Sequence, residues 1–215
     1  MPRLSWIALS ICFATSFFSN ESLAGLVVGY DVLGGSELSA VNGSNVTGVN
    51  LTRGGGATDA GGGSDFATAN WTTSSYLQFG FTSTVAYDLT NVRFSISGDA
   101  GVPAPNNFKL QVAVNGGAFS DLAPSLVFDV SSNSDVAFTN VSSLTNVDDV
   151  LFRLVSETAP VSGGEIRLFD VPEGSLDPAN PTLDFIVEGV AVPEPSSGLL
   201  LVAFGAGLSW HRRRD

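Results

Sequence analysis

The side chains that most often carry out nucleophilic catalysis are scarce in this sequence. It contains one histidine, His211, and one cysteine, Cys12, and both lie near the ends of the chain. Serine and cysteine nucleophiles are usually activated by a neighbouring base such as histidine, and zinc sites are built mainly from histidine and cysteine. Because the residues between the two ends include no histidine or cysteine, Ser–His catalysis, Cys–His catalysis and histidine-rich zinc sites are excluded there.

Carboxylates are the remaining groups that could do chemistry. Residues 25–192 hold 18 acidic and five basic side chains. Asp148 and Asp149 are adjacent, but neighbouring side chains on an extended chain point to opposite faces, so they form a poor acid–base pair. Glycosidases need two carboxyl groups about 5–9.5 Å apart, and no motif selects such a pair. We therefore predict that the chain is not an enzyme, and we keep a secreted carboxylate-dependent hydrolase as the second alternative.

Loop carboxylates also suggest a structural calcium ion, because Ca²⁺ prefers carboxylate and carbonyl oxygens. Asp31, Asp65 and Asp170 are the candidates, since each follows an expected strand or lies in an expected loop. The alternative for each is a solvated surface acid. We predict no other cofactor. The excess of acidic side chains excludes nucleic acid as a partner, because phosphate contacts need a basic face.

Aromatic side chains could serve as platforms for sugar rings, and the candidates for such stacking are Trp71, Tyr76 and Tyr87. The alternative is that Trp71 belongs to the core, as large aromatic side chains often do. The sequence has 15 phenylalanines but only three tryptophans. Phenylalanine therefore supplies most of the aromatic core, and the role of Trp71 stays open between the two interpretations.

The elements that must position these residues are strands. Apolar and polar residues alternate with a period of two, and turn-forming residues separate the runs. The Asn115-Gly116 dipeptide is typical of a tight hairpin turn, and residues 53–65 are glycine-rich and predict a surface loop. We therefore expect residues 25–190 to form one all-β domain, an antiparallel β-sandwich. The expected strands are 25–32, 43–52, 76–84, 87–97, 108–115, 126–130, 136–138, 150–157, 165–171 and 183–190.

The N-terminal residues 1–24 have the features of a secretory signal peptide. Arg3 supplies the positive start, an apolar helical run follows, and small residues at positions 22 and 24 predict cleavage after Ala24. An alternative is lipidation at Cys12, but Ile11 is too large to precede a lipidated cysteine. Cleavage after Ala24 removes Cys12, so the mature chain has no cysteine and forms no disulfide.

The C-terminal residues 191–215 form a second distinct segment. Pro193, Glu194 and Pro195 precede an uncharged apolar run at 198–210, and a basic tail at 211–215 follows with Arg212, Arg213 and Arg214. A helix from Ser196 to Trp210 would extend about 22 Å, short of the hydrocarbon core of about 30 Å. The arginines would act as a stop on the cytoplasmic side. The alternative is a buried C-terminal helix, although the run shows no polar face.

The order Pro-Glu-Pro, apolar helix, arginine cluster resembles the bacterial PEP-CTERM protein-sorting signal. The resemblance covers residues 191–215. It implies that Pro193 to Pro195 are the recognition motif, that 198–210 is a transient transmembrane anchor and that Arg212 to Arg214 are the membrane stop. It also implies two processing partners, a signal peptidase and an exosortase-type transpeptidase. The short helix makes processing a better expectation than permanent residence in the membrane.

A weaker resemblance concerns the body of the chain. Residues 46–55, the stretch from Trp71 to Phe79, and residues 151–171 look like a recurrent β-sandwich that precedes this same signal, similar to the jelly-roll sandwiches of carbohydrate-binding modules. We therefore expect an exported, briefly membrane-anchored protein of the cell envelope, extracellular matrix or biofilm. Its expected role is structural or adhesive, and the first alternative is a carbohydrate-binding module with polysaccharide as its partner.

Overall fold

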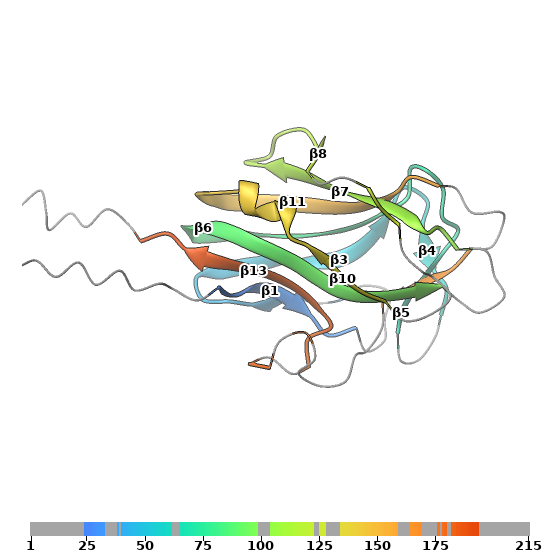
Figure 1. Ribbon diagram of the computed structural model, residues 1–215, viewed down its shortest axis with the longest axis horizontal. Coiled ribbons are helices and arrows are strands. Elements are labelled where there is room, and N and C mark those ends of the chain that lie inside the picture. The colour runs from blue at the N-terminus through green and yellow to red at the C-terminus, as the bar shows by residue number, and fades with distance from the viewer. Residues whose placement is uncertain are drawn as a thin grey trace, which may run out of the picture.

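The computed structural model describes residues 24–32, 38, 40–61, 65–98, 104–122, 125–127, 134–158, 164–168, 176, 178–179 and 182–193. Nearly all the regular structure in this part of the chain is β-strand (Figure 1). The strands are β1 (Gly25–Tyr30), β2 (Val41–Asn42), β3 (Val46–Gly54), β4 (Thr58–Asp59), β5 (Phe66–Ala69), β6 (Tyr76–Gly98), β7 (Asn107–Val114), β8 (Ser120–Asp121), β9 (Leu126–Val127), β10 (Ser134–Phe138), β11 (Val147–Ser156), β12 (Ile166–Leu168) and β13 (Phe185–Ala191). A short 3-10 helix, η1 (Asn140–Ser143), precedes β11.

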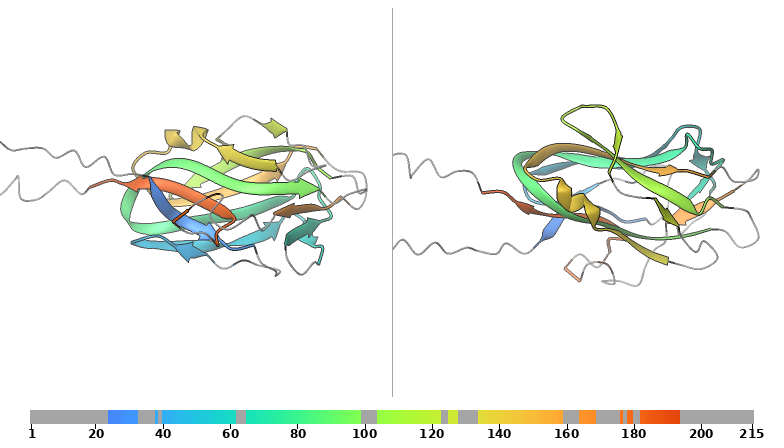
Figure 2. Two further views of the ribbon diagram at one scale, coloured as in Figure 1. Left: turned by 60° about the horizontal axis from the view of Figure 1, so that its bottom comes forward. Right: turned by 45° about the horizontal axis from the view of Figure 1, so that its top comes forward.

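The strands form two layers that share one long strand, β6 (Figure 2). In the first layer, the first half of β6 lies between β3 and β11, and β7 and β8 continue the sheet beyond β11. In the second layer, the other half of β6 lies between β13 and β10, and β1 and β2 continue beyond β13. All of these pairings are antiparallel. This confirms the expected all-β antiparallel body.

The side chains of β6 explain how one strand can serve two layers. Leu77, Phe79 and Phe81 are buried, and the alternation resumes at Tyr87 and Leu89. A register shift against β11 lies between Val147 and Asp149, opposite residues 82–87 of β6. A second shift, against β13, lies between Glu188 and Gly189. The buried apolar residues are odd-numbered up to Leu89 and even-numbered from Val92 to Ile96. The bulge between Leu89 and Asn91, opposite Glu188 and Gly189, therefore changes which face of β6 points inward, and the strand keeps its apolar residues inside in both layers.

Aromatic rings join the two layers in the core. Phe79 of β6 packs against Phe152 of β11 in the same layer, with ring centroids 5.2 Å apart. Phe79 also meets Phe185 of β13 across the layers at 4.6 Å. Phe185 in turn stacks on Phe94 at 4.9 Å. All four rings are fully buried, and burial of each contributes about 1.5–3 kcal/mol, so this cluster is a main source of cohesion between the layers.

A tyrosine hydroxyl forms the polar link between the layers. Tyr30 of β1 donates a hydrogen bond to the Val49 carbonyl at 2.6 Å and accepts one from the Gly80 N–H at 3.4 Å. The register of β3 shifts between Val49 and Thr52, so this carbonyl lies at an irregular point of the sheet. Burial raises the pKa of the Tyr30 phenol far above its ordinary value, because the phenolate would lose its hydration.

The expected strands recur in the structure, with differences at β6 and at the short strands, of which β2, β4, β5 and β8 were not expected. Residues 76–98 form a single strand, although the sequence predicts two, because no glycine or proline lies between Thr84 and Tyr87 to turn the chain. The predicted Asn115-Gly116 turn is confirmed, with φ of 53° and 68°. β4 lies in the glycine-rich stretch that was expected to be only a loop.

The two predicted terminal helices, in residues 1–24 and 198–210, lie outside the described residues. Within the part that is described, no helix has the length and apolar character needed to cross a membrane.

The Tyr30 link makes a first testable prediction. Tyr30→Phe leaves the ring packing intact but leaves the Val49 carbonyl without its donor, so we expect the free energy of unfolding to fall by about 1–3 kcal/mol. Tyr87→Phe is the matched control, since the Tyr87 hydroxyl bonds the Ser44 carbonyl at an exposed residue where water can replace it. The control should lose less than about 1 kcal/mol. Urea denaturation of the full chain measures both, and equal losses would contradict the role given to Tyr30.

Candidate functional site

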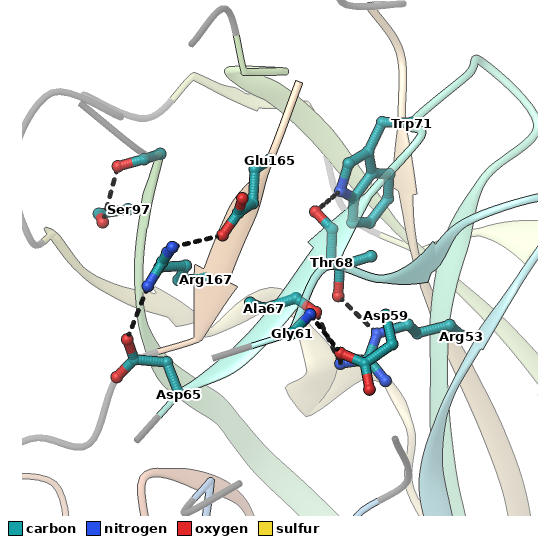
Figure 3. Close-up of polar contacts among 11 residues, drawn as sticks. Arg53, Asp59, Gly61, Asp65, Ala67, Thr68, Trp71, Ser97, Glu165 and Arg167 are labelled. Atoms are coloured by element: carbon teal, nitrogen blue, oxygen red, sulfur yellow. Dashed lines mark hydrogen bonds and ion pairs between the residues drawn. The ribbon is translucent and has the colours of Figure 1, made fainter. Parts of the chain in front are cut away.

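Two arginine networks lie at the end of the sandwich where β3, β4, β5 and β12 meet (Figure 3). The first is centred on Arg53 of β3, whose side chain is only 5% exposed. Its Nε donates to Thr68 Oγ1 at 3.0 Å, and its Nη2 donates to the Ala67 carbonyl at 2.7 Å. The guanidinium carbon lies 3.6 Å from the centroid of the Phe66 ring.

The Arg53 charge is held in place by one carboxylate. Asp59 of β4 lies 3.6 Å from Arg53 Nη2. Burial lowers the pKa of Arg53, and the negative charge of Asp59 opposes that shift. The group stays charged because an arginine pKa begins so high. Because these contacts tie β3 to β4 and β5, the network stabilises this end of the sheet.

The second network is centred on Arg167 of β12 and includes one calcium candidate. Asp65 lies 3.4 Å from Arg167 Nη1, and Glu165 lies 2.7 Å from Arg167 Nη2. All three side chains are largely buried, with 27% of Arg167, 11% of Asp65 and 15% of Glu165 exposed. The Asp65 carboxylate is thus engaged by a cation of the protein itself, so a calcium ion would have to compete with Arg167 for it.

The described part of the chain shows no cluster of calcium candidates around Asp65. Asp31 is half-buried directly after β1, and Asp170 lies outside the described residues. In the part of the chain that the structure places, no three Asp, Glu, His or Cys side chains gather as metal ligands would. A structural calcium ion stays a prediction.

Trp71 lies inside the protein and does not form a surface platform. It is 3% exposed, its Nε1 donates to the Thr68 carbonyl at 2.9 Å, and its ring meets Phe108 edge-on at 5.5 Å. Stacking on a sugar requires an open ring face, which these contacts and this burial do not leave. The structure therefore corrects the stacking assignment in favour of the core alternative.

The outward face of the first layer carries a row of polar side chains that sequence reasoning missed. Strand register aligns one residue from each of five neighbouring strands: Thr52 of β3, Gln78 of β6, Arg153 of β11, Gln111 of β7 and Asp121 of β8. Their neighbours along the strands, such as Phe79 and Phe152, are fully buried, so the row faces away from the core. The sequence gives one indication of this row: Gln78, Arg153 and Gln111 each lie between two residues that belong to the core.

Arg153 occupies the centre of this row in a fixed position. Its Nε donates to Gln78 Oε1 at 2.9 Å. Its guanidinium carbon lies 4.0 Å from the centroid of the Tyr76 ring and 3.9 Å from that of Phe119, which lies just before β8. Cation–π contacts of this kind are favourable. Together, the two rings and the amide hold the guanidinium without neutralising it.

The remaining polar side chains of the row are linked on the far side of Arg153. Gln111 donates to Asp121 Oδ1 at 2.7 Å, and Lys109 of β7 pairs with Asp121 Oδ2 at 3.1 Å. These two contacts lower the pKa of the Asp121 carboxyl, the Gln111 hydrogen bond most. Glu157 lies 3.9 Å from Lys109, so the lysine charge is shared between two acids.

The two ends of the body leave it side by side. Gly25 at the start of β1 pairs with Gly189 near the end of β13. The Val192 N–H donates to the Ala86 carbonyl at 2.8 Å, and the exposed Pro193 follows directly. Ala24, the predicted cleavage residue, is likewise exposed immediately before β1. Glu194, Pro195 and Arg212 to Arg214 lie outside the described residues.

Comparison with known proteins agrees with the C-terminal prediction. Residues 191–214 match the PEP-CTERM protein-sorting motif, and this match confirms the resemblance read from Pro193 to Arg214. The motif indicates that the protein is exported and sorted toward the cell envelope. No curated protein matches the sequence significantly.

Solved structures give distant likenesses. One is the CBM22-1 xylan-binding domain from Paenibacillus barcinonensis Xyn10C, with 10% identity, 79% of this chain and 97% of that chain covered, and a TM-score of 0.47. Another is TmCBM61 in complex with β-1,4-galactotriose, with 12% identity, coverage of 67% and 88%, and a TM-score of 0.26. Both TM-scores are too low for these likenesses to carry an argument about this chain.

The Arg53 network makes a second prediction, about stability. Arg53→Met leaves the Ala67 carbonyl and the Thr68 hydroxyl without their charged donor, so we expect unfolding to become about 2–3 kcal/mol easier. Lys109→Met is the matched control, because its pair with Asp121, 57% exposed, is solvated and should be worth less than about 1 kcal/mol. Chemical denaturation of the full-length variants tests this, and an Arg53→Met loss no larger than the control would refute the structural role.

Proposed function

We propose that this chain is a non-catalytic structural or adhesive protein of the bacterial cell envelope or extracellular matrix. The observation that carries the proposal is the sorting motif at residues 191–214, which begins on the last residue of the final strand. Residues 1–24 would direct export, residues 25–190 would form the working body, and residues 191–215 would hold and sort it. A role in a biofilm matrix belongs to the same proposal.

The processing events follow from the places where the body begins and ends. A signal peptidase would cut after Ala24, which leaves β1 whole because the strand starts at Gly25. An exosortase-type transpeptidase would recognise Pro193, Glu194 and Pro195 beyond β13, while residues 198–210 serve as a transient membrane helix and Arg212 to Arg214 as its stop. Both cuts would spare every residue of the core, so the mature body keeps its fold.

The proposal that the body does no bond-breaking is supported by the scarcity of suitable groups. His211 is the only histidine and falls in the basic tail, and Cys12 would leave with the signal peptide. Asp148 is exposed at the start of β11 and Asp149 follows it on the same strand, so the two side chains diverge. The described carboxyls that meet at one group, Asp65 with Glu165 and Asp121 with Glu157, are engaged by Arg167 and Lys109.

Carbohydrate binding is the second candidate function, and one observation favours it. The polar row across the first layer offers amide, hydroxyl and guanidinium groups on the outward sheet face, with the row about 19 Å long at the usual strand spacing. Sugars are bound through such planar polar groups together with apolar contacts. This face would give an adhesive protein its means of attachment to a polysaccharide.

The proposed sorting makes a third prediction. Replacing Pro193, Glu194 and Pro195 together by alanine should leave the protein at its full C-terminal length and in the membrane fraction, because the recognition motif is gone. The wild-type protein should lose its C-terminal segment and move to the envelope or the medium. Fractionation followed by mass spectrometry of the intact protein reads both outcomes in cells that carry the transpeptidase.

The matched control for this experiment is Ser196→Ala with Ser197→Ala, which changes the neighbouring residues and keeps the motif. It should be processed as the wild type is. Identical mass and location for the motif variant and the wild type would refute the sorting proposal. Since the Val192 N–H anchors the end of β13 to β6, none of these changes should unfold the body.

A further inference from the structure

We infer that Arg153 is the anion-binding centre of a polysaccharide site on the outward face of the first layer, and that its ligand is a chain containing uronic acid residues. The arginine would hold the sugar carboxylate, while the neighbouring polar row would hold ring hydroxyls. The inference deepens the adhesive and carbohydrate-binding roles proposed above and rests on them for its biological setting. Its physical basis lies in the Arg153 contacts and in the side chains beside them on the same face.

Charge distinguishes Arg153 from the other basic side chains of the body. Among the described residues, every basic side chain of the body except Arg153 has a carboxylate within ion-pair distance. The pairs are Arg53 with Asp59, Arg93 with Glu188, Lys109 with Asp121 and Arg167 with Asp65. The contacts of the Arg153 guanidinium are an amide oxygen and two aromatic rings, all uncharged. In a body with 18 acidic side chains, an arginine without an acid partner is a notable exception.

The guanidinium of Arg153 is held in a fixed position before any ligand binds. An exposed arginine normally loses side-chain entropy when it binds a ligand, and that loss weakens binding. Here Tyr76 and Phe119 pack against the guanidinium, and Gln78 takes the Nε hydrogen. Those contacts leave the Nη1 and Nη2 hydrogens for a ligand. Two parallel N–H donors in a fixed plane match the two oxygens of a carboxylate.

The side chains around Arg153 indicate what kind of molecule bears the carboxylate. Gln78 and Gln111 flank Arg153 on the two neighbouring strands, and Thr52 continues the row. Amides and hydroxyls in line can exchange hydrogen bonds with successive sugar hydroxyls. In the next row, Val49 and Leu151 give half-buried apolar surface for the C–H faces of sugar rings. A linear acidic polysaccharide fits this combination.

The acidic surface of the rest of the protein makes the site selective. A polyanion is repelled by most of the body, because residues 25–192 carry 18 acidic against five basic side chains. Binding must therefore depend on short-range contact with Arg153, where attraction is local and directional.

The test uses the full chain purified in mild detergent and two acidic probes, polygalacturonate and polymannuronate, each beside its methyl ester. Affinity electrophoresis should show retardation by at least one acid and not by its ester, because esterification removes the charge and keeps the sugar ring. Arg153→Gln should weaken binding about 10- to 100-fold, the range expected for charge-assisted hydrogen bonds. Arg153→Lys should recover only part of the affinity, because an ammonium lacks the planar pair of donors.

Two further variants keep the result interpretable. Arg93→Gln removes a cation that is already paired with Glu188 on the other layer, so it should bind as the wild type does. Phe119→Ala keeps the Arg153 charge and removes one ring that holds it, so it should reduce affinity severalfold. Thermal unfolding of each variant establishes that the protein is folded under the binding conditions.

The outcomes separate this inference from the proposals it rests on. Equal retardation by acid and ester, with no effect of Arg153→Gln, would overturn the inference and favour a site for neutral glycan. If inorganic phosphate competed as strongly as galacturonate, the site would be a general anion site, and the inference would also be overturned. Folded protein that binds neither acid overturns it as well. Sorting by Pro193 to Pro195 is read by fractionation, so it can succeed or fail independently.

Discussion

The structure depends on the continuous burial of one face of β6. This strand pairs with β3 and β11 in one layer and with β13, β10 and β12 in the other. Without a bulge, two residues an odd number of positions apart point to opposite faces of a strand. The shift against β13, between Leu89 and Asn91 of β6, changes the inward face, so Phe79 and Phe94 both point into the same core although they belong to different layers.

Sequence patterns recover the long strands because each must bury every second residue. β7 and β11 lie within two or three residues of the expected ranges for this reason. The short strands β4 and β5 are missed because they depend on pairing with neighbouring strands and show no alternation of apolar and polar residues. Phe66, Ala67 and Thr68 of β5 are buried without alternation, and Arg53 ties that strand to β3 from 14 residues away. Such a contact leaves no periodic trace in the sequence.

The candidate site is less predictable than the fold, again for a physical reason. Alternation shows that Arg153 points away from the core, because Phe152 and Leu154 point into it. It does not show what meets the guanidinium, since Gln78 lies 75 residues away. Trp71 illustrates the reverse case. Its type suggests a sugar platform, but its Nε1 finds the Thr68 carbonyl inside the protein, and a satisfied polar group allows a large ring to be buried.

Arg53 and Arg153 show how the same side chain takes opposite roles on the two faces of one layer. Arg53 points inward, where leaving it unpaired would be costly, and its partners are Asp59, the Ala67 carbonyl and the Thr68 hydroxyl. Arg153 points outward, where water can solvate its unpaired charge at little cost. Folding therefore does not require that Arg153 lack an acidic partner. Binding of a carboxylate ligand does require it, because an acidic partner would occupy the guanidinium. That difference makes Arg153, and not the better-connected Arg53, the residue whose surroundings are explained by a ligand.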